Sequence, residues 1–119
     1  MRTHKLGTSD LEVSLLCLGS MTWGSQNSES EGHAQIDRAL ERGVNFIDTA
    51  EMYPTTPMSA ETTGRTEEII GTWVANSGKR DQAVIATKIT GPNGGMMRAG
   101  RGIFADTIVD AVDGSLRRL

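Results

Sequence analysis

Cysteine and long apolar runs are scarce in this sequence of 119 residues. Cys17 is the only cysteine, which excludes an internal disulfide and favours a reducing compartment such as the cytoplasm. Because Cys17 lies inside a short apolar run, we expect a small buried hydrophobe and not a reactive thiol. No apolar stretch approaches the roughly 20 residues of a membrane span, and the basic N-terminus lacks the apolar segment of a signal peptide. We therefore expect a cytoplasmic protein with no membrane segment.

Positive charge is also limited. The sequence has 12 lysines and arginines against 15 aspartates and glutamates, a net charge of -3 and a pI near 5.3. This balance argues against nucleic acid or an anionic membrane as the main partner. Four arginines are not interleaved with aromatic residues as on a nucleic-acid surface, so we expect solvated charges. These are Arg98, Arg101, Arg117 and Arg118.

Histidine is rare, and two common nucleotide-binding motifs are absent. His4 and His33 fall on a predicted hairpin and a predicted helix, where neither is well placed as a metal ligand or a catalytic base. We therefore expect no metal site. The glycine pattern of a Rossmann fold is missing at residues 19–24, and the sequence around Gly78 does not form a P-loop.

Strand-like and helix-like segments alternate along the chain. We predict a hairpin over residues 3–14, strands at 15–18, 44–48 and 83–87, helices over 28–43, 66–76 and 105–118, and long loops at 54–65 and 91–102. The apolar run at 15–18 is typical of a strand that is buried on both faces. Strands alternating with helices imply right-handed crossovers and a parallel sheet. The predicted fold class is therefore α/β, as one domain or part of one.

Local signals define the predicted helices. Ser28 and Glu31 have the spacing of a capping box at a helix N-terminus, and Gly43 supplies the end of that helix. The last predicted helix has one apolar face, with residues at spacings of four, four and three. These residues are Ile108, Val112, Leu116 and Leu119.

Groups that can do chemistry follow each predicted strand. Gly19 and Ser20 end the first strand, Asp48 ends the second with Tyr53 five residues on, and Lys88 ends the third. Functional residues of parallel α/β folds gather at the C-terminal ends of strands, so we expect one shared rim. A lysine ammonium favours a nearby phenolate, and a buried aspartate keeps the lysine charged, so the tyrosine could exchange a proton near neutral pH. The simpler interpretations are that Asp48 is a cap, Tyr53 is packing and Lys88 is a solvated charge.

Four motifs, in this order, resemble the aldo-keto reductase superfamily. They are Asp48-Thr49-Ala50-x-x-Tyr53, Glu67-x-x-x-Gly71, Ala86-Thr87-Lys88 and Ser115-Leu116-x-x-Leu119. Residues 50–54 (AEMYP), with residues 26–29 (QNSE) upstream, are similar to the Tas-like branch in particular. The resemblance covers essentially the whole chain, and several ordered motifs are far more specific than any one of them.

The resemblance implies a fold and an activity. The fold would be the N-terminal part of a (β/α)8 TIM barrel, with the hairpin closing the barrel floor and three βα units after it. NADP(H) would bind without a Rossmann fold, and hydride would pass between the nicotinamide and an aldehyde or ketone, a small-molecule carbonyl substrate. Pro54 and the insertion up to Gly64 depart from the Tyr-Gly of many members, so we expect a distinctive substrate rim. Neither the particular substrate nor the oligomeric state follows from the sequence.

The resemblance also implies residue roles. Tyr53 would be the general acid that protonates the carbonyl oxygen, Lys88 would lower the pKa of Tyr53, and Asp48 would anchor Lys88. The positions that would approach the nicotinamide half of the cofactor are Gly19, Ser20, Met21, Gln26 and Asp48.

Part of the family's site has no counterpart in residues 1–119. The family's catalytic histidine follows the fourth strand, and a barrel of this type needs about 250 residues. We therefore expect a single partial domain, an N-terminal fragment of the barrel that is inactive in isolation. Two alternatives to a reductase stay open. One is a cofactor-binding regulatory or redox-sensing subunit of the same fold, as in potassium-channel β subunits, and the other is a non-functional truncated remnant.

Overall fold

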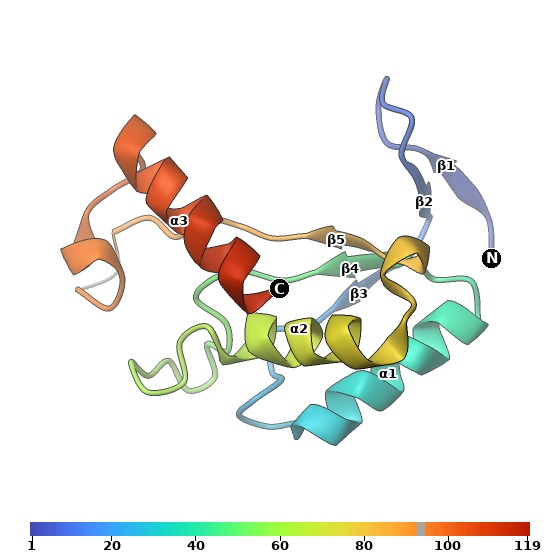
Figure 1. Ribbon diagram of the computed structural model, residues 1–119, viewed down its shortest axis with the longest axis horizontal. Helices are drawn as coiled ribbons and strands as arrows, with labels where there is room; N and C mark the ends of the chain where they lie inside the picture. The colour runs from blue at the N-terminus through green and yellow to red at the C-terminus, as the bar shows by residue number, and fades with distance from the viewer. Residues whose placement is uncertain (93–94) are drawn as a thin grey trace.

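A parallel sheet of three short strands forms the centre of the molecule (Figure 1). The computed structural model describes residues 1–92 and 95–119. The sheet order is β3 (Cys17–Gly19), β4 (Phe46–Asp48) and β5 (Val84–Ala86). The register pairs Gly19 with Asp48 and Asp48 with Ala86, so the C-terminal ends of all three strands are level. The parallel sheet predicted from the alternation of strands and helices is confirmed.

The described residues form three helices, two of which connect the strands while the third follows the last strand. They are α1 (Glu29–Glu41), α2 (Arg65–Ser77) and α3 (Ala105–Arg118), and two short 3-10 turns lie at Arg80–Gln82 (η1) and Arg98–Gly100 (η2). Helices α1 and α2 lie side by side along the sheet, and the C-terminal end of α3 lies against α2 (Figure 1). Residues 93–94 of the predicted loop at 91–102 lie outside the described residues. No helix within the described ranges is both long and apolar enough to cross a membrane.

The predicted N-terminal hairpin is present and is tied to the start of β4. It consists of β1 (Thr3–Lys5) and β2 (Glu12–Ser14), paired antiparallel. The Ser14 backbone N–H donates to Oδ1 of Asn45 at 2.8 Å, and the Asn45 backbone N–H donates to Ser14 Oγ at 3.1 Å. Because Asn45 directly precedes β4, the hairpin stands at the N-terminal end of the sheet, away from the rim where the strands end.

The first helix begins as its sequence predicts. The Ser28 backbone N–H donates to Glu31 Oε2 at 2.7 Å, and the Glu31 N–H donates to Ser28 Oγ at 3.3 Å, which completes a capping box. After the helix, Gly43 takes a φ of 76°, a left-handed conformation that glycine adopts without a steric penalty. The two signals therefore fix both ends of α1.

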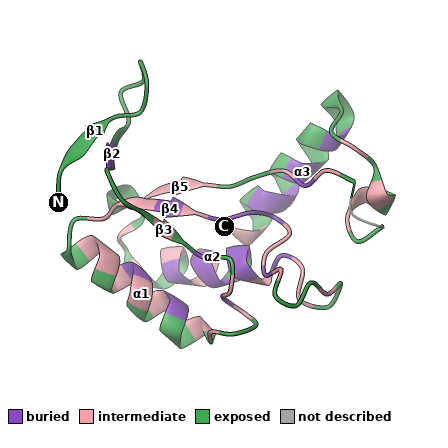
Figure 2. Cartoon of the chain, turned by 180° about the vertical axis from the view of Figure 1, so that it is seen from behind, coloured by how far each residue is buried: buried purple, intermediate pink, exposed green. Residues whose placement is uncertain are grey.

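The core fills the space between the sheet and helices α1 and α2 (Figure 2). Ile36, Ile47, Ile69 and Ile70 are each 0–1% exposed. The remaining core members are Trp23, Trp73 and Ala83. Burying side chains of this size removes about 1.5–3 kcal/mol each of unfavourable apolar hydration, so this layer holds the sheet against the helix pair.

Helix α3 approaches α2 closely at a glycine. A methyl group on Gly71 would overlap the carbonyl oxygen of Arg118. Beside this contact, Arg118 Nε donates to Oε2 of the fully buried Glu67 at 2.7 Å. Glu67 Oε1 accepts from the Thr87 hydroxyl at 2.5 Å. Glu67 and Gly71, which lie one helical turn apart on α2, therefore contact α3, and Glu67 also contacts the residue after β5.

Two predictions about burial are wrong. The run at residues 15–18 is largely exposed, with Leu15 49% and Leu16 60% exposed. Cys17 is also exposed and is not the buried hydrophobe that we expected. The physical reason is that β3 is an edge strand of the three-stranded sheet.

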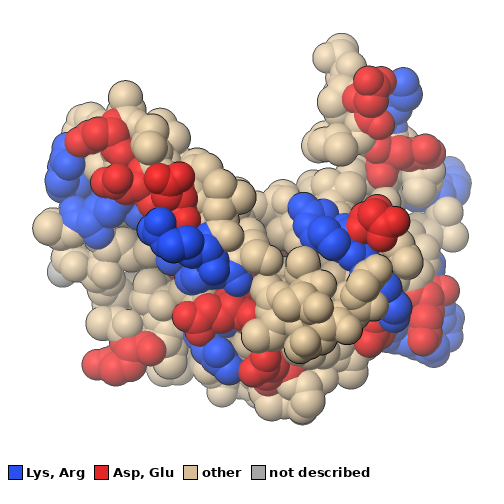
Figure 3. Space-filling view, viewed as in Figure 1, with Lys and Arg blue, Asp and Glu red and all other residues tan. Residues whose placement is uncertain are grey.

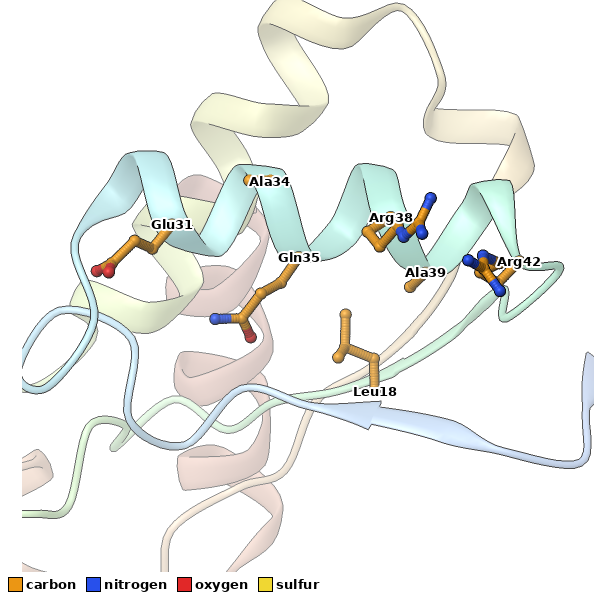
Figure 4. A pocket seen from close by; sticks show the side chains of 7 residues that line it. All are labelled: Leu18, Glu31, Ala34, Gln35, Arg38, Ala39 and Arg42. Carbon is orange, nitrogen blue, oxygen red and sulfur yellow. The ribbon is translucent and has the colours of Figure 1, made fainter.

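The apolar face of α3 is uncovered in the described chain. Ile108, Val112 and Leu116 are 39%, 43% and 72% exposed, whereas Ala111 on the other side is 1% exposed. A groove of about 370 Å³ runs between this helix and β5. A second groove of about 590 Å³ lies between α1 and the β3 edge, where Leu18 faces α1 (Figure 4). Both edges of the sheet are thus open, and the described residues form part of a barrel and not a closed one.

Candidate active site

The level ends of β3, β4 and β5 bring the predicted rim residues together. Because Gly19, Asp48 and Ala86 are in register, Lys88 emerges two residues beyond the end of its strand, next to Asp48. Lys88 Nζ donates to Asp48 Oδ1 at 2.6 Å. The two side chains are 47% and 43% exposed, so Asp48 is not the buried aspartate that the sequence suggested. The ion pair is therefore exposed to solvent at the C-terminal ends of the strands.

Tyr53 contacts the same lysine through its ring. Lys88 Nζ is 5.0 Å from the centroid of the Tyr53 ring, within the range of a cation–π contact. Partial burial of the amine lowers the Lys88 pKa, but the hydrogen bond to Asp48 and the attraction of Tyr53 outweigh this, and the pKa is raised above its usual value. Lys88 therefore carries a positive charge at neutral pH.

The backbone around Tyr53 is fixed by the start of α2. The Tyr53 carbonyl accepts from the N–H groups of Gly64 at 3.1 Å and Thr66 at 3.3 Å. Its own N–H donates to Ala50 at 3.1 Å, and the following Pro54 is buried. Unpaired N–H groups at a helix N-terminus need acceptors, so α2 holds Tyr53 in place while the ring stays half-buried beside Lys88.

Ser20 adds a hydrogen bond from the first strand end. Its hydroxyl donates to the Asp48 carbonyl at 2.7 Å, and the residue is 1% exposed. Met21, the next residue, is 44% exposed. A Cβ at Gly19 would meet no heavy atom within 4 Å. Gly19 and Met21 therefore border the rim, and the buried Ser20 lies beneath it. The cofactor roles of all three residues stay predictions.

Gln26 lies in a separate turn after β3. The Gln26 backbone N–H donates to the Thr22 carbonyl at 3.0 Å, and the hydroxyl of the adjacent Ser25 donates to the Thr56 carbonyl at 2.9 Å. The contacts of this turn therefore lead to the 54–65 loop and not to Asp48 or Lys88. A cofactor role for Gln26 stays a prediction.

Sequence reasoning missed a buried ion pair beside the rim. Glu51, two residues before Tyr53, is paired with Arg98, and their side chains are only 1% and 13% exposed. The expectation that Arg98 and Arg118 are solvated charges is therefore wrong, since Arg118 also pairs with the buried Glu67. The only signal was the position of Glu51 within the motif, because its partner lies 47 residues away.

The rim offers groups that suit the polar nicotinamide end of a dinucleotide. Open space lies above Gly19, and the half-exposed Asp48 and Lys88 present a hydrogen-bond acceptor and a donor. On the face shown in Figure 3, acidic and basic side chains are interspersed and form no continuous basic surface for phosphates. The described residues thus fit one end of such a cofactor.

Comparison with known proteins identifies the family of the chain. The model of the aldo/keto reductase family matches residues 15–119. The chain is 45% identical to the Tas protein of Escherichia coli, in an alignment that covers all of this chain and 35% of that protein. It is 40% identical to the uncharacterized oxidoreductase YrpG of Bacillus subtilis, covering 96% of this chain and 35% of YrpG.

A solved structure gives the same result for the fold. The crystal structure of a putative aldo-keto reductase from Pseudomonas aeruginosa aligns with a TM-score of 0.73 and 30% identity, over 98% of this chain and 42% of that one. The chain thus spans about a third of the length of the curated relatives. It has the architecture of the corresponding part of a TIM barrel. With the family model matching most of its length, the chain belongs to the aldo/keto reductase family.

Proposed function

We propose that this chain provides the proton-transfer half of an NADP(H)-dependent carbonyl reductase. The reaction is hydride transfer between the nicotinamide and an aldehyde or ketone. The observation that supports this most is the contact of Lys88 with both Asp48 and Tyr53 at the level strand ends. Because the chain spans 35% of its relatives, the proposal concerns the product of the complete reading frame, and the 119-residue chain alone is expected to be inactive.

Each residue of the rim has a defined task in the proposal. Tyr53 donates its phenolic proton to the carbonyl oxygen of the substrate. The Lys88 ammonium places a positive charge beside the phenolate that remains, which lowers the free energy of that charge. Asp48 holds the ammonium in position through its 2.6 Å contact. The raised pKa of Lys88 means that this charge is present across the neutral pH range.

The first and second strand ends would hold the cofactor. When bound, NADP(H) supplies the hydride that the carbonyl carbon accepts. The residues proposed to hold its nicotinamide half are Gly19, Ser20, Met21, Gln26 and Asp48. Since the Ser20 hydroxyl donates to the Asp48 carbonyl and the residue is 1% exposed, Ser20 would act from beneath the cofactor by fixing the end of β4. The choice of NADP(H) rests on the family resemblance.

The test uses the protein from the complete reading frame with NADPH and a panel of aldehydes and ketones, followed by the loss of nicotinamide absorbance. Tyr53→Phe should lower turnover by about 10²–10⁴-fold, the usual contribution of a general acid, while NADPH affinity stays close to that of the parent. Leu6→Met, in the exposed hairpin at the N-terminal end of the sheet and away from the rim, is the control and should keep full activity. No carbonyl reduction by the parent, or retained turnover in Tyr53→Phe, would contradict the proposal.

A further inference from the structure

Glu51 is a buried carboxylate, and its side-chain partners among the described residues lie on the segment that follows Lys88. Arg98 Nη1 donates to Glu51 Oε2 at 2.9 Å, and Arg98 Nη2 donates to Glu51 Oε1. The Thr90 N–H donates to Glu51 Oε1 at 2.6 Å. Only 1% of the Glu51 side chain is exposed, so these donors replace water as the hydrogen-bond partners of its carboxylate. The carboxylate thus joins the loop after β4 to the loop between β5 and α3.

The backbone of Glu51 makes the same connection. Its N–H donates to the Lys88 carbonyl at 3.2 Å, just beyond the bond from Thr49 to Ala86 at 2.9 Å. Glu51 therefore contacts Lys88 through its backbone N–H and Thr90 through its side chain. These contacts fix how far Lys88 extends past the strand end relative to Asp48 and Tyr53.

Arg98 is held in an unusual backbone conformation. Its φ is 46° and that of Ala99 is 53°, in the left-handed region that residues other than glycine seldom adopt. Such conformations persist where surrounding contacts determine them. The bidentate pair with Glu51 and a bond from Arg98 Nη2 to the Thr90 carbonyl at 3.2 Å are contacts of this kind. The turn at Arg98 is thus shaped to reach Glu51.

We propose that Glu51 is a positioning residue, which acts with Arg98 to keep Lys88 against Asp48 and Tyr53. The proposal rests on the function proposed above for those three residues. Burial raises the pKa of Glu51, but hydrogen bonds from Arg98 and Thr90 outweigh it and lower the pKa below its usual value, so the carboxylate stays charged at neutral pH. Glu51 touches neither the ammonium nor the phenol and acts through the backbone that carries Lys88.

The lysines of the chain allow a test that does not depend on turnover. Lys79 and Lys88 have similar exposure, 42% and 47%, and each pairs with an aspartate, Asp37 and Asp48 respectively. Only Lys88 is connected to Glu51. Brief labelling with acetic anhydride, followed by peptide mass spectrometry, measures the reactivity of each amine in the folded product of the complete reading frame. Lys79 serves as the internal control for any general loosening of the fold.

Glu51→Gln should raise the labelling rate of Lys88 relative to Lys79 by roughly threefold or more, which corresponds to about half a pKa unit. Arg98→Gln, which keeps the carboxylate, is a second variant in case Glu51→Gln does not fold, and it should act in the same direction. Arg101→Gln is the matched control, because Arg101 lies in the same loop but pairs with the exposed Asp106 at 2.8 Å. It should leave the ratio unchanged.

An unchanged Lys88 to Lys79 ratio in a folded Glu51 or Arg98 variant would overturn the proposal. So would an equal rise at both lysines, since that is the result of general destabilisation. The outcome is separable from the proposed function. If the parent reduces no carbonyl but the ratio still rises selectively, the link from Glu51 to Lys88 stands and the reductase assignment fails.

Discussion

The Nζ atom of Lys88 lies 2.6 Å from Oδ1 of Asp48, although 40 residues separate the two in sequence. Both side chains are nearly half exposed, and an ion pair in such a position contributes about 1 kcal/mol or less to stability. Its importance is therefore positional. The pair keeps a positive charge 5.0 Å from the centre of the Tyr53 ring.

Stability should fall with rising pH through the titration of Lys88. Because the Lys88 pKa is raised in the folded state above its usual 10.5, the ion pair stabilises the fold fully below that value. The contribution is lost as the pH rises through the folded pKa. We expect the difference in unfolding free energy between the parent and Lys88→Met to be constant from pH 7 to 9 and to shrink above pH 10.5. Urea titrations followed by tryptophan fluorescence measure it, and a difference that does not change with pH would contradict the assignment.

Cys17 should react with a disulfide reagent in the folded chain, but slowly. Its side chain is exposed, so one thiol should titrate without denaturant. Although the side chain is exposed, neighbouring groups remove part of its hydration, and this desolvation together with Asp48 raises the Cys17 pKa above the usual 9.0, with Lys88 partly opposing them, so less thiolate is present at neutral pH. We expect a lower rate than in the unfolded chain and a further decrease in Lys88→Met. The rate of release of a chromogenic thiol measures this, and a faster reaction in the variant would contradict it.

Local sequence signals predicted the elements well because each depends on neighbouring residues. The capping box at Ser28 formed, and the helices predicted at 66–76 and 105–118 are observed at Arg65–Ser77 and Ala105–Arg118. The rule that functional groups follow parallel strands predicts that Asp48, Tyr53 and Lys88 lie together, and the structure places Lys88 in contact with both.

Burial and pairing were harder to predict, because they depend on elements distant in sequence. The run at 15–18 is apolar, yet it lies on an edge strand and is exposed. Arg98 is one of two arginines in the glycine-rich stretch at residues 91–102. Nothing near it in the sequence distinguishes it from Arg101, which is exposed. Only the fold shows that Arg98 reaches the buried Glu51.

Gly71→Ala should destabilise the chain even though alanine favours helices. The added methyl would overlap the Arg118 carbonyl oxygen, so α2 and α3 would have to move apart. Overpacking of this kind costs about 1–3 kcal/mol, which exceeds the gain in helix propensity of about 1 kcal/mol or less. Gly91→Ala is the control, because a Cβ there meets no atom within 4 Å. Thermal unfolding by circular dichroism compares them, and equal midpoints would show that the helices need no glycine here.

The uncovered face of α3 should make the 119-residue chain bind hydrophobic dyes and associate with itself. Leu116 is 72% exposed, next to a groove of about 370 Å³ that includes Val112 and Leu119. Exposed apolar surface of this kind promotes association, so Leu116→Lys should reduce dye fluorescence and shift sedimentation toward the monomer. Asp113→Asn makes the same change in net charge on the same helix without removing apolar area. It should leave both measurements as in the parent. If the two variants behaved alike, charge and not the apolar face of α3 would be controlling association.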